Sequence, residues 1–235
     1  MEVVIAVAKT KKYATQSSGD TVEVVERPQG GVSVVLADGQ SSGQGAKTIS
    51  TMVVRKVISL LAEGVRDGAA ARAASDYLYT ERRGKVSSTL NIISVDKETS
   101  TLVITRNNPV LALLVRNDQI TLLDEESLPV GLYRGTRPVI CEVPLEPGLI
   151  AVVFSDGLVH AGSRYSQSVD VISHLQVFLE DEEPSVQGFA DHLLEHANKL
   201  DQGRPVDDIS IVVLRVSSRV GDTVRRMTVR LPLDE

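Results

Sequence analysis

Three aspartates, Asp38, Asp156 and Asp207, stand at the ends of apolar, strand-like segments that lie far apart in the sequence. The segments are residues 32–37, 149–154 and 209–216. Strand ends are places where a rigid scaffold can gather distant side chains around one point. Oxygen ligands alone select a hard cation such as Mg²⁺ or Mn²⁺ over zinc. Two such ions roughly 3.5 to 4 Å apart can bind a phosphate ester and activate a shared water, so the pattern predicts metal-dependent phosphomonoester hydrolysis.

A fourth acid, Asp20, begins the strand-like segment that directly precedes the one ending in Asp38. Pro28–Gly31 supplies a turn, so the two segments are predicted to form a hairpin that places Asp20 near Asp38. Like charges tolerate that proximity only with a cation between them. Gly39 allows the backbone to turn, so that its carbonyl oxygen can also reach the ion.

Two other interpretations of the segment after Asp38 compete with a metal site. A phosphate-binding loop also follows a strand, contains several glycines and leads into a helix through a Lys and a Thr. That motif is not matched, because Ala46 precedes Lys47 in place of its second glycine. An Asp-Gly turn that binds nothing stays open. A second Asp-Gly pair, at residues 156–157, favours a site over a turn.

A pair of histidines offers a different metal chemistry. His192 and His196 lie on a predicted helix and, with Glu195, match the H-x-x-E-H pattern of zinc peptidases. A zinc site needs a third ligand, and the other histidines, His160 and His174, are in other elements. The sequence therefore favours an ordinary solvated helix face.

The composition argues against several classes of partner. A net charge of −6 and an aromatic content of 3% argue against binding of nucleic acid. The N-terminal segment lacks the long apolar stretch of a secretory signal or a membrane span, and the single cysteine, Cys141, excludes an internal disulfide. We therefore expect a cytoplasmic protein that does not contact membranes, with Cys141 buried as a small hydrophobic residue.

The hydrophobic pattern predicts a mixed α+β fold in which helices cover the outer faces of antiparallel sheets. Apolar positions at helical spacing predict four helices, over residues 46–64, 67–82, 167–180 and 184–200. Short segments joined by turns predict an antiparallel meander, over residues 88–95, 101–105, 110–116 and 119–123. We expect a single domain over residues 1–235, in which residues 218–235 have the pattern of an additional C-terminal edge strand.

Five short motifs appear in the order in which a known family has them: residues 18–20 (SGD), 35–39 (VLADG), 128–131 (LPVG), 154–158 (FSDGL) and 207–213 (DDISIVV). Together they resemble the metal-dependent protein serine/threonine phosphatases, the PPM family of the 2C type, and within it the bacterial SpoIIE-like branch. The sequence is most similar to the RsbX-like stand-alone phosphatases of the bacterial stress response. The resemblance extends to about residue 216.

The resemblance implies a four-layer α/β/β/α sandwich of two antiparallel sheets flanked by helices. It also implies two Mn²⁺ or Mg²⁺ ions. Asp38 would bridge both ions, while Asp156 and Asp207 would complete the first, and these three would be catalytic through a metal-bound water. Gly39 would offer its carbonyl oxygen to the second ion, and Asp20 would act through water or as an outer ligand.

The implied reaction is hydrolysis of phosphoserine or phosphothreonine on a phosphorylated regulatory protein, by a water activated between the two divalent ions. The substrate would belong to a signalling circuit of kinases and phosphatases. The alternative is a catalytically weak pseudophosphatase, or a phosphoprotein-binding module, on the same fold.

Three positions bear on how far the family pattern applies. Asp208 stands where many relatives have Asn or Asp, which implies a supporting role. Many 2C-type enzymes have a His after the first Asp-Gly pair as a suggested proton donor, but this chain has Gln40, which cannot donate that proton. An Ala-Gly-His-Pro-like turn is replaced by Arg106–Pro109; Asn tolerates the left-handed backbone that Gly would supply, so the turn can be kept.

Overall fold

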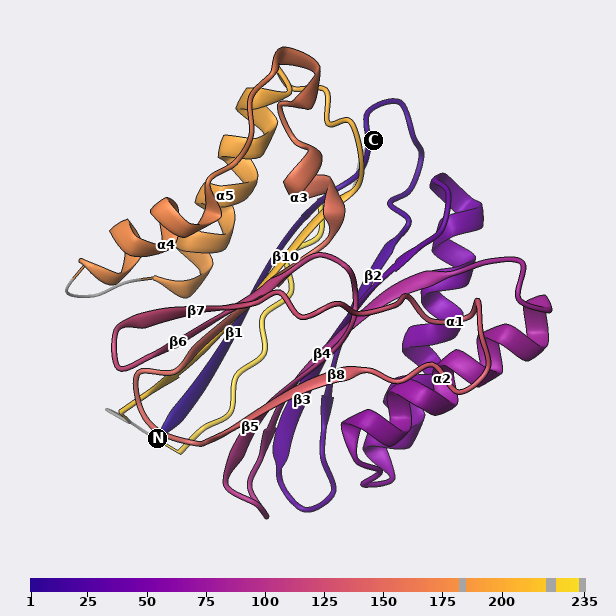
Figure 1. The fold of residues 1–235 in the computed structure, drawn as a ribbon. Coiled ribbons are helices and arrows are strands. Elements are labelled where there is room, and N and C mark those ends of the chain that lie inside the picture. The colour runs from indigo at the N-terminus through magenta and orange to yellow at the C-terminus, as the bar shows by residue number, and fades with distance from the viewer. Residues whose placement is uncertain (182–184, 219–222, 233–235) are drawn as a thin grey trace.

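Two five-stranded antiparallel sheets face each other, and helices cover the outer side of each (Figure 1). The computed structural model describes residues 1–181, 185–218 and 223–232. The layers run helices, sheet, sheet, helices, so the predicted α/β/β/α sandwich is confirmed. Three apolar cores hold these layers together, one between the sheets and one under each group of helices.

The first sheet combines strands from both ends of the described chain. Its strands, in spatial order, are β1 (Glu2–Thr10), β10 (Ile209–Ser217), β9 (Ile150–Phe154), β6 (Ala112–Arg116) and β7 (Gln119–Leu123). β9 and β10 are buried along almost their whole length, because one face meets the other sheet and the opposite face meets helices. Their uninterrupted apolar sequences are typical of strands covered on both sides.

The second sheet contains the predicted hairpin. Its strands, in spatial order, are β2 (Asp20–Glu26), β3 (Gly31–Gly39), β4 (Ser88–Asp96), β5 (Thr101–Asn107) and β8 (Val139–Pro144). β2 and β3 are antiparallel, and their register sets Asp20 directly opposite Asp38. This pairing confirms the expected proximity of the two acids.

Two helices pack on each outer face. They are α1 (Gly43–Ala62) and α2 (Asp67–Arg82) on the second sheet, and α4 (Val171–Leu179) and α5 (Val186–Leu200) on the first. α1 buries Val53, Val57 and Leu61, which recur at the spacing of one helix face. A short helix, α3 (Asp156–His160), and a 3-10 turn (Ser163–Tyr165) follow β9. None of the described helices is long and apolar enough to cross a membrane.

The meander predicted over residues 88–123 is wrong. β4 and β5 pair in the second sheet, but the chain then crosses to the first sheet, where β6 pairs with β7 and β9. An alternating pattern specifies which face of a strand is buried and leaves the choice of partner strand open.

The turn at this crossing is held by side chains. The buried guanidinium of Arg106 donates to the carbonyl oxygens of Asn108 and Glu125, at 3.1 and 2.7 Å. Asn107 donates to the carbonyl oxygen of Leu128 at 3.0 Å. Neither asparagine has a positive φ, so the turn does not use the left-handed backbone that Asn tolerates. Hydrogen bonds from long polar side chains shape the turn without it.

Several predicted boundaries differ from the structure; α1, for example, begins at Gly43 instead of residue 46 and ends at Ala62 instead of residue 64. α4 begins at Val171 instead of residue 167, because Asp170 caps it by accepting a hydrogen bond from the Ser173 amide at 3.1 Å. α5 begins at Val186, and the predicted start at residue 184 lies outside the described residues.

The extra edge strand expected over residues 218–235 is not formed by the described part of that tail, residues 218 and 223–232. The remaining residues of that range lie outside the described structure. Apolar side chains of the tail are exposed, namely Val224, Met227, Val229 and Leu231. Because these side chains are 59–81% exposed, strand pairing there would gain little of the stabilisation that burial gives the other edge strands.

A buried ion pair fixes α2 against the second sheet. Arg27, just after β2, contacts the Oδ1 atom of Asp67 through Nη1 at 2.6 Å, and both side chains are at most 5% exposed. Arg27 also donates to the carbonyl oxygen of Val65 at 3.2 Å. Burial raises the pKa of Asp67, so its ionised form depends on Arg27. The pair therefore links the hairpin that carries two site aspartates to the start of α2.

We predict that Arg27→Met lowers the free energy of unfolding by about 3–5 kcal/mol, because it leaves the Asp67 carboxylate buried without its partner. Urea unfolding followed by circular dichroism measures this loss. The double variant Arg27→Met/Asp67→Asn removes both charges and is expected to recover part of the stability. A double variant that loses as much as the sum of both single variants contradicts this account.

Candidate active site

Four aspartates lie where the two sheets meet at one end of the sandwich. Asp20 opens β2 and Asp38 lies at the end of β3, in the second sheet. Asp156 opens α3 directly after β9, and Asp207 precedes β10, both at the first sheet. The charges of Asp20, Asp156 and Asp207 all act on Asp38. The structure thus gathers the four acids that the sequence predicted to converge.

Burial and like charge oppose ionisation of these carboxyl groups. Burial raises the pKa of Asp38 to about 9, and the negative charges of its three neighbours add to the shift. Burial also raises the pKa of Asp20 to about 6, and burial and Asp207 raise that of Asp156. Asp20 is fully buried, and neither of its carboxyl oxygens has the geometry of a hydrogen bond with a described residue, although the side chains of Ser155 and Ser210 act to lower its pKa. Such a group is costly unless a proton or a cation compensates it.

Two glycines of the site are required by close backbone contacts. A Cβ atom at Gly39 would overlap the carbonyl oxygen of Ala46 in α1, and one at Gly157 would overlap the carbonyl oxygen of Asp208. Neither glycine has a positive φ, so the turn expected at Gly39 is not the reason for its presence. The missing side chains let α1 and the segment before β10 approach the aspartates.

Asp208 fastens two chain segments that carry site residues. Its Oδ1 atom accepts from the amide of Lys12 and its Oδ2 atom from the amide of Gly19, both at 2.8 Å. Because Gly19 directly precedes Asp20, these bonds fix the start of β2 relative to Asp207. This geometry fits a supporting role for Asp208.

Two lysines beside Asp20 were not singled out as site residues from the sequence. Lys9 and Lys47 both donate from Nζ to the main-chain carbonyl oxygen of Asp20, at 2.5 and 2.8 Å. Lys9 as a residue is exposed, but its ammonium group is desolvated, which lowers its pKa to about 8. Lys47 also donates to the hydroxyl of Thr21 at 2.9 Å. The sequence shows Lys9 close to the end of β1, but nothing in the sequence places it near Asp20. β1 pairs with β10, so only the tertiary fold brings Lys9 to Asp20.

The residues next to Asp38 brace its main chain. The hydroxyl of Ser88 donates to the carbonyl oxygen of Asp38 at 2.6 Å. The side-chain oxygen of Gln40 accepts from the amide of Ser87 at 2.9 Å, so this amide group is engaged in holding the start of β4. Ser88 also exchanges two main-chain hydrogen bonds with Val130, which lies in the LPVG motif.

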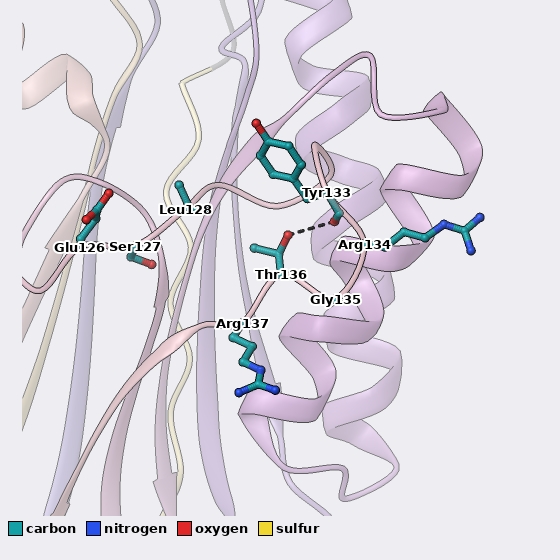
Figure 2. Close-up of a pocket in the computed structure, with 8 residues that line it drawn as sticks. All are labelled: Glu126, Ser127, Leu128, Tyr133, Arg134, Gly135, Thr136 and Arg137. Atoms are coloured by element: carbon teal, nitrogen blue, oxygen red, sulfur yellow. Dashed lines mark hydrogen bonds between the residues drawn. The ribbon is translucent and has the colours of Figure 1, made fainter.

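The segment that contains this motif forms the wall of a shallow pocket of about 450 Å³ (Figure 2). Figure 2 shows the side chains of Arg134 and Arg137 pointing away from each other, with a hydrogen bond of 2.9 Å between the Thr136 hydroxyl and the Tyr133 carbonyl oxygen. The guanidinium of Arg134 lies 5.2 Å from the ring centre of Tyr79 in α2. This segment is thus anchored both to α2 and, through Ser88, beside Asp38.

The donor set fits a hard divalent cation. It consists of carboxylate oxygens and the carbonyl oxygen of Gly39, and Asp20 contributes two buried oxygens that lack a partner. Over the described ranges, no three Asp, Glu, His or Cys side chains surround a point closely enough to hold an ion alone. Coordination by one or two carboxylates with several water molecules is the usual arrangement for Mg²⁺. Asp38, Asp156 and Asp207 are partly exposed, so water reaches them.

Sequence comparison identifies the family to which this arrangement belongs. The sequence model of the family described as stage II sporulation protein E (SpoIIE) matches residues 28–217. The stage II sporulation protein E of Bacillus subtilis (strain 168) is 22% identical over 200 residues, which are 85% of this chain and 24% of that protein. The chain thus spans about a quarter of the length of this curated relative.

Comparison with solved structures identifies the fold. The PP2C phosphatase domain of B. subtilis SpoIIE, solved with a fragment of its regulatory domain, matches with a TM-score of 0.78 at 20% identity, over 94% of this chain and 64% of that one. The catalytic domain of the serine/threonine phosphatase PstP, in complex with two manganese ions, matches with a TM-score of 0.68 at 18% identity. The match covers 92% of this chain and 99% of that one. RsbX in complex with magnesium matches with a TM-score of 0.68 at 15% identity, over 92% of this chain and 96% of that one. The fold is therefore that of PP2C phosphatases.

We predict that the metal-free protein loses stability as the pH rises from about 4 towards 9. Between those limits the folded state keeps the proton of Asp38 that the unfolded chain releases, because the pKa is raised from 3.8 to about 9. Asp38→Asn removes this proton, so its melting temperature in a chelator should fall less between pH 5 and pH 8 than that of the wild type. Added Mn²⁺ should raise the wild-type melting temperature at pH 8 and raise that of the variant less.

The matched control is Asp118→Asn, in the turn between β6 and β7, which should keep the wild-type pH dependence. Asp118 has a positive φ of 57°, which Asn accepts. A pH dependence that is identical in wild type and Asp38→Asn would show that Asp38 keeps no extra proton in the folded state.

Proposed function

The chain belongs to the SpoIIE family, and from this we propose that residues 1–235 form a single phosphatase domain that hydrolyses phosphoserine or phosphothreonine on a regulatory protein. The reaction uses two Mn²⁺ or Mg²⁺ ions. The observation that carries the proposal is the buried carboxylate of Asp20, which lacks a partner and lies opposite Asp38 at the meeting point of the two sheets. A structural turn would not maintain such an arrangement, because it costs stability without a cation.

The ion-holding set in this proposal is Asp20, Asp38, Gly39, Asp156 and Asp207. Asp38 faces the charges of the other three acids, which supports its role as the residue shared by both ions. Asp156 and Asp207 interact electrostatically with each other and approach from the first sheet, which suits joint binding of one ion. The complete burial of Asp20 suits an outer position, behind the three partly exposed acids.

The bound ions supply Lewis acidity, which lowers the pKa of a water and neutralises the phosphate group. The chain itself holds the acids in position. Lys9 and Lys47 fix the main chain at Asp20, and their positive charges offset part of the negative charge of the cluster. Gln40 has no ionisable proton, so it does not protonate the leaving serine or threonine oxygen.

In this proposal the substrate is a phosphorylated protein and not a small metabolite. Asp38, Asp156 and Asp207 are partly exposed, so the site is open to solvent. The segment of residues 126–137 lies beside it and presents Arg134 and Arg137, whose charges suit an acidic phosphoprotein surface. The likeness to B. subtilis SpoIIE, described as a cell fate determinant, supports a regulatory substrate. A role in bacterial signalling and the stress response, in the cytoplasm, is part of this proposal.

A catalytically weak pseudophosphatase or phosphoprotein-binding module on the same fold is the second candidate. It would bind a phosphoprotein tightly without releasing phosphate. The presence of all four acids favours an enzyme, because a binding module gains nothing from carboxylates that repel both each other and a phosphate group.

The test is phosphate release from an aryl phosphate and from phosphorylated regulatory proteins of the same genome, with Mn²⁺ and with chelator. We predict activity that requires the metal and that falls at least about 100-fold in Asp38→Asn, since loss of even an outer partner of a metal ligand costs 10–100-fold. Asp156→Asn should show a similar loss. The exposed variant Asp118→Asn serves as control and should retain wild-type activity.

Full activity in chelator, or in Asp38→Asn, would refute the metal-dependent mechanism. Tight binding of a phosphoprotein by wild type, without phosphate release at any Mn²⁺ concentration, would favour the binding module instead.

A further inference from the structure

Three of the four histidines in the chain gather on the outer surface between α4 and α5. His174 lies on α4, and His192 and His196 lie one turn apart on α5. The Nδ1 atom of His174 and the Nε2 atom of His192 are 3.2 Å apart. The ring of His174 lies 4.6 Å from that of His196, measured between ring centres. His174, on α4, therefore stands next to the pair of histidines on α5 as a third histidine.

The two helices are held in register next to this cluster. Phe178, one turn after His174, stacks on Phe189, which lies almost one turn before His192, with 4.7 Å between ring centres. Both phenylalanines are buried in the core under the helices. The same face of α5 buries Leu193. The relative position of the three imidazoles is thus set by packing of the helix pair.

The electrostatic surroundings favour neutral imidazole. Burial, followed by the charges of His196 and His192, lowers the pKa of His174, whereas Asp170 at the start of α4 acts in the opposite direction. Three imidazoles in contact cannot all be protonated without mutual repulsion. Neutral imidazole is the form that binds a metal ion.

We propose that His174, His192 and His196 form a binding site for a borderline transition-metal ion such as Zn²⁺, Co²⁺ or Ni²⁺. Nitrogen ligands suit these ions, whereas the oxygen-rich aspartate site suits Mg²⁺ or Mn²⁺. Two nitrogens bound to one tetrahedral Zn²⁺, each about 2.0–2.1 Å from it, are separated by about 3.3 Å. The 3.2 Å between His174 and His192 matches that separation. Histidines four residues apart on one helix are also an established pair of zinc ligands.

Binding requires a small rearrangement of side chains. In the described parts of the chain, no three such side chains yet surround a single point. The metal ion would take the place of the hydrogen bond between His174 and His192, whose proton moves to the other nitrogen of the same ring or to water, and the third ring would turn its nitrogen toward the ion. His192 is exposed and His196 is half-buried, so both rings have room to rotate and the ion can enter from water. Water fills the remaining coordination positions.

This site is separate from the aspartates and does not depend on the proposed phosphatase activity. The ion would clamp α4 to α5. α5 is followed by its capping residue Asp201, whose carboxylate accepts from the amides of Gly162, at 2.9 Å, and Val206, at 3.1 Å. The clamp would therefore stiffen the helix whose end holds the segment before Asp207.

The experiment is titration of the full chain with Co²⁺ in a large excess of Mg²⁺, followed by visible absorption of the cobalt ion and by calorimetry. We expect one equivalent of Co²⁺ to bind, with displacement by Zn²⁺ and release below about pH 6, where imidazole is protonated. His192→Ala and His174→Ala should each weaken binding at least about tenfold. Because His192 is exposed, its variant tests the site even if His174→Ala does not fold.

Two controls separate the sites. Gln176→Ala, an exposed position on α4, should bind Co²⁺ as the wild type does. Asp38→Asn should also bind it unchanged, whatever its effect on phosphate release. Absence of stoichiometric binding in the wild type, persistence of binding in His192→Ala, or its loss in Asp38→Asn would each overturn the proposal.

Discussion

The repulsion between Asp20 and Asp38 is the constraint on which the rest of the structure depends. An antiparallel register forces the two acids together, and burial denies water to Asp20. Several features exist to hold that arrangement: ammonium groups on the main chain of Asp20, a hydroxyl on that of Asp38, and two glycines that admit neighbouring backbone. Each feature prevents the acids from moving apart. Their repulsion therefore lowers the stability of the folded protein, and bound cations would restore that stability.

Neither sheet contains the site alone. One sheet contributes Asp20 and Asp38 from adjacent strands, and the other contributes Asp156 and Asp207 from the segments around β9 and β10. Asp208 joins the two halves through hydrogen bonds to the amides of Lys12 and Gly19. The core between the sheets is therefore part of the active-site geometry, because a shift of one sheet against the other moves half of the acids.

The sequence alone predicted the helices and strands better than it predicted which strands pair with each other. Asp-Gly pairs after apolar strands led to Asp38 and Asp156, and the hairpin placed Asp20 correctly, because local turn chemistry determines that register. The crossing between sheets after Arg106 was missed, since strand alternation does not encode a partner strand. Lys9 and the meeting of His174 with His192 and His196 were also missed. Those contacts join segments from different parts of the chain, and only tertiary packing creates them.

The pairing of β1 with β10 joins residues near opposite ends of the described chain, with Glu2 beside Ser217. Closing so long a loop is entropically expensive, so this contact is expected to form late in folding. During synthesis the ribosome must release β10 before Asp207 can join the other acids. A nascent chain therefore holds Asp20 and Asp38 for some time without the other half of the site, and metal-dependent stabilisation can act only on the finished protein.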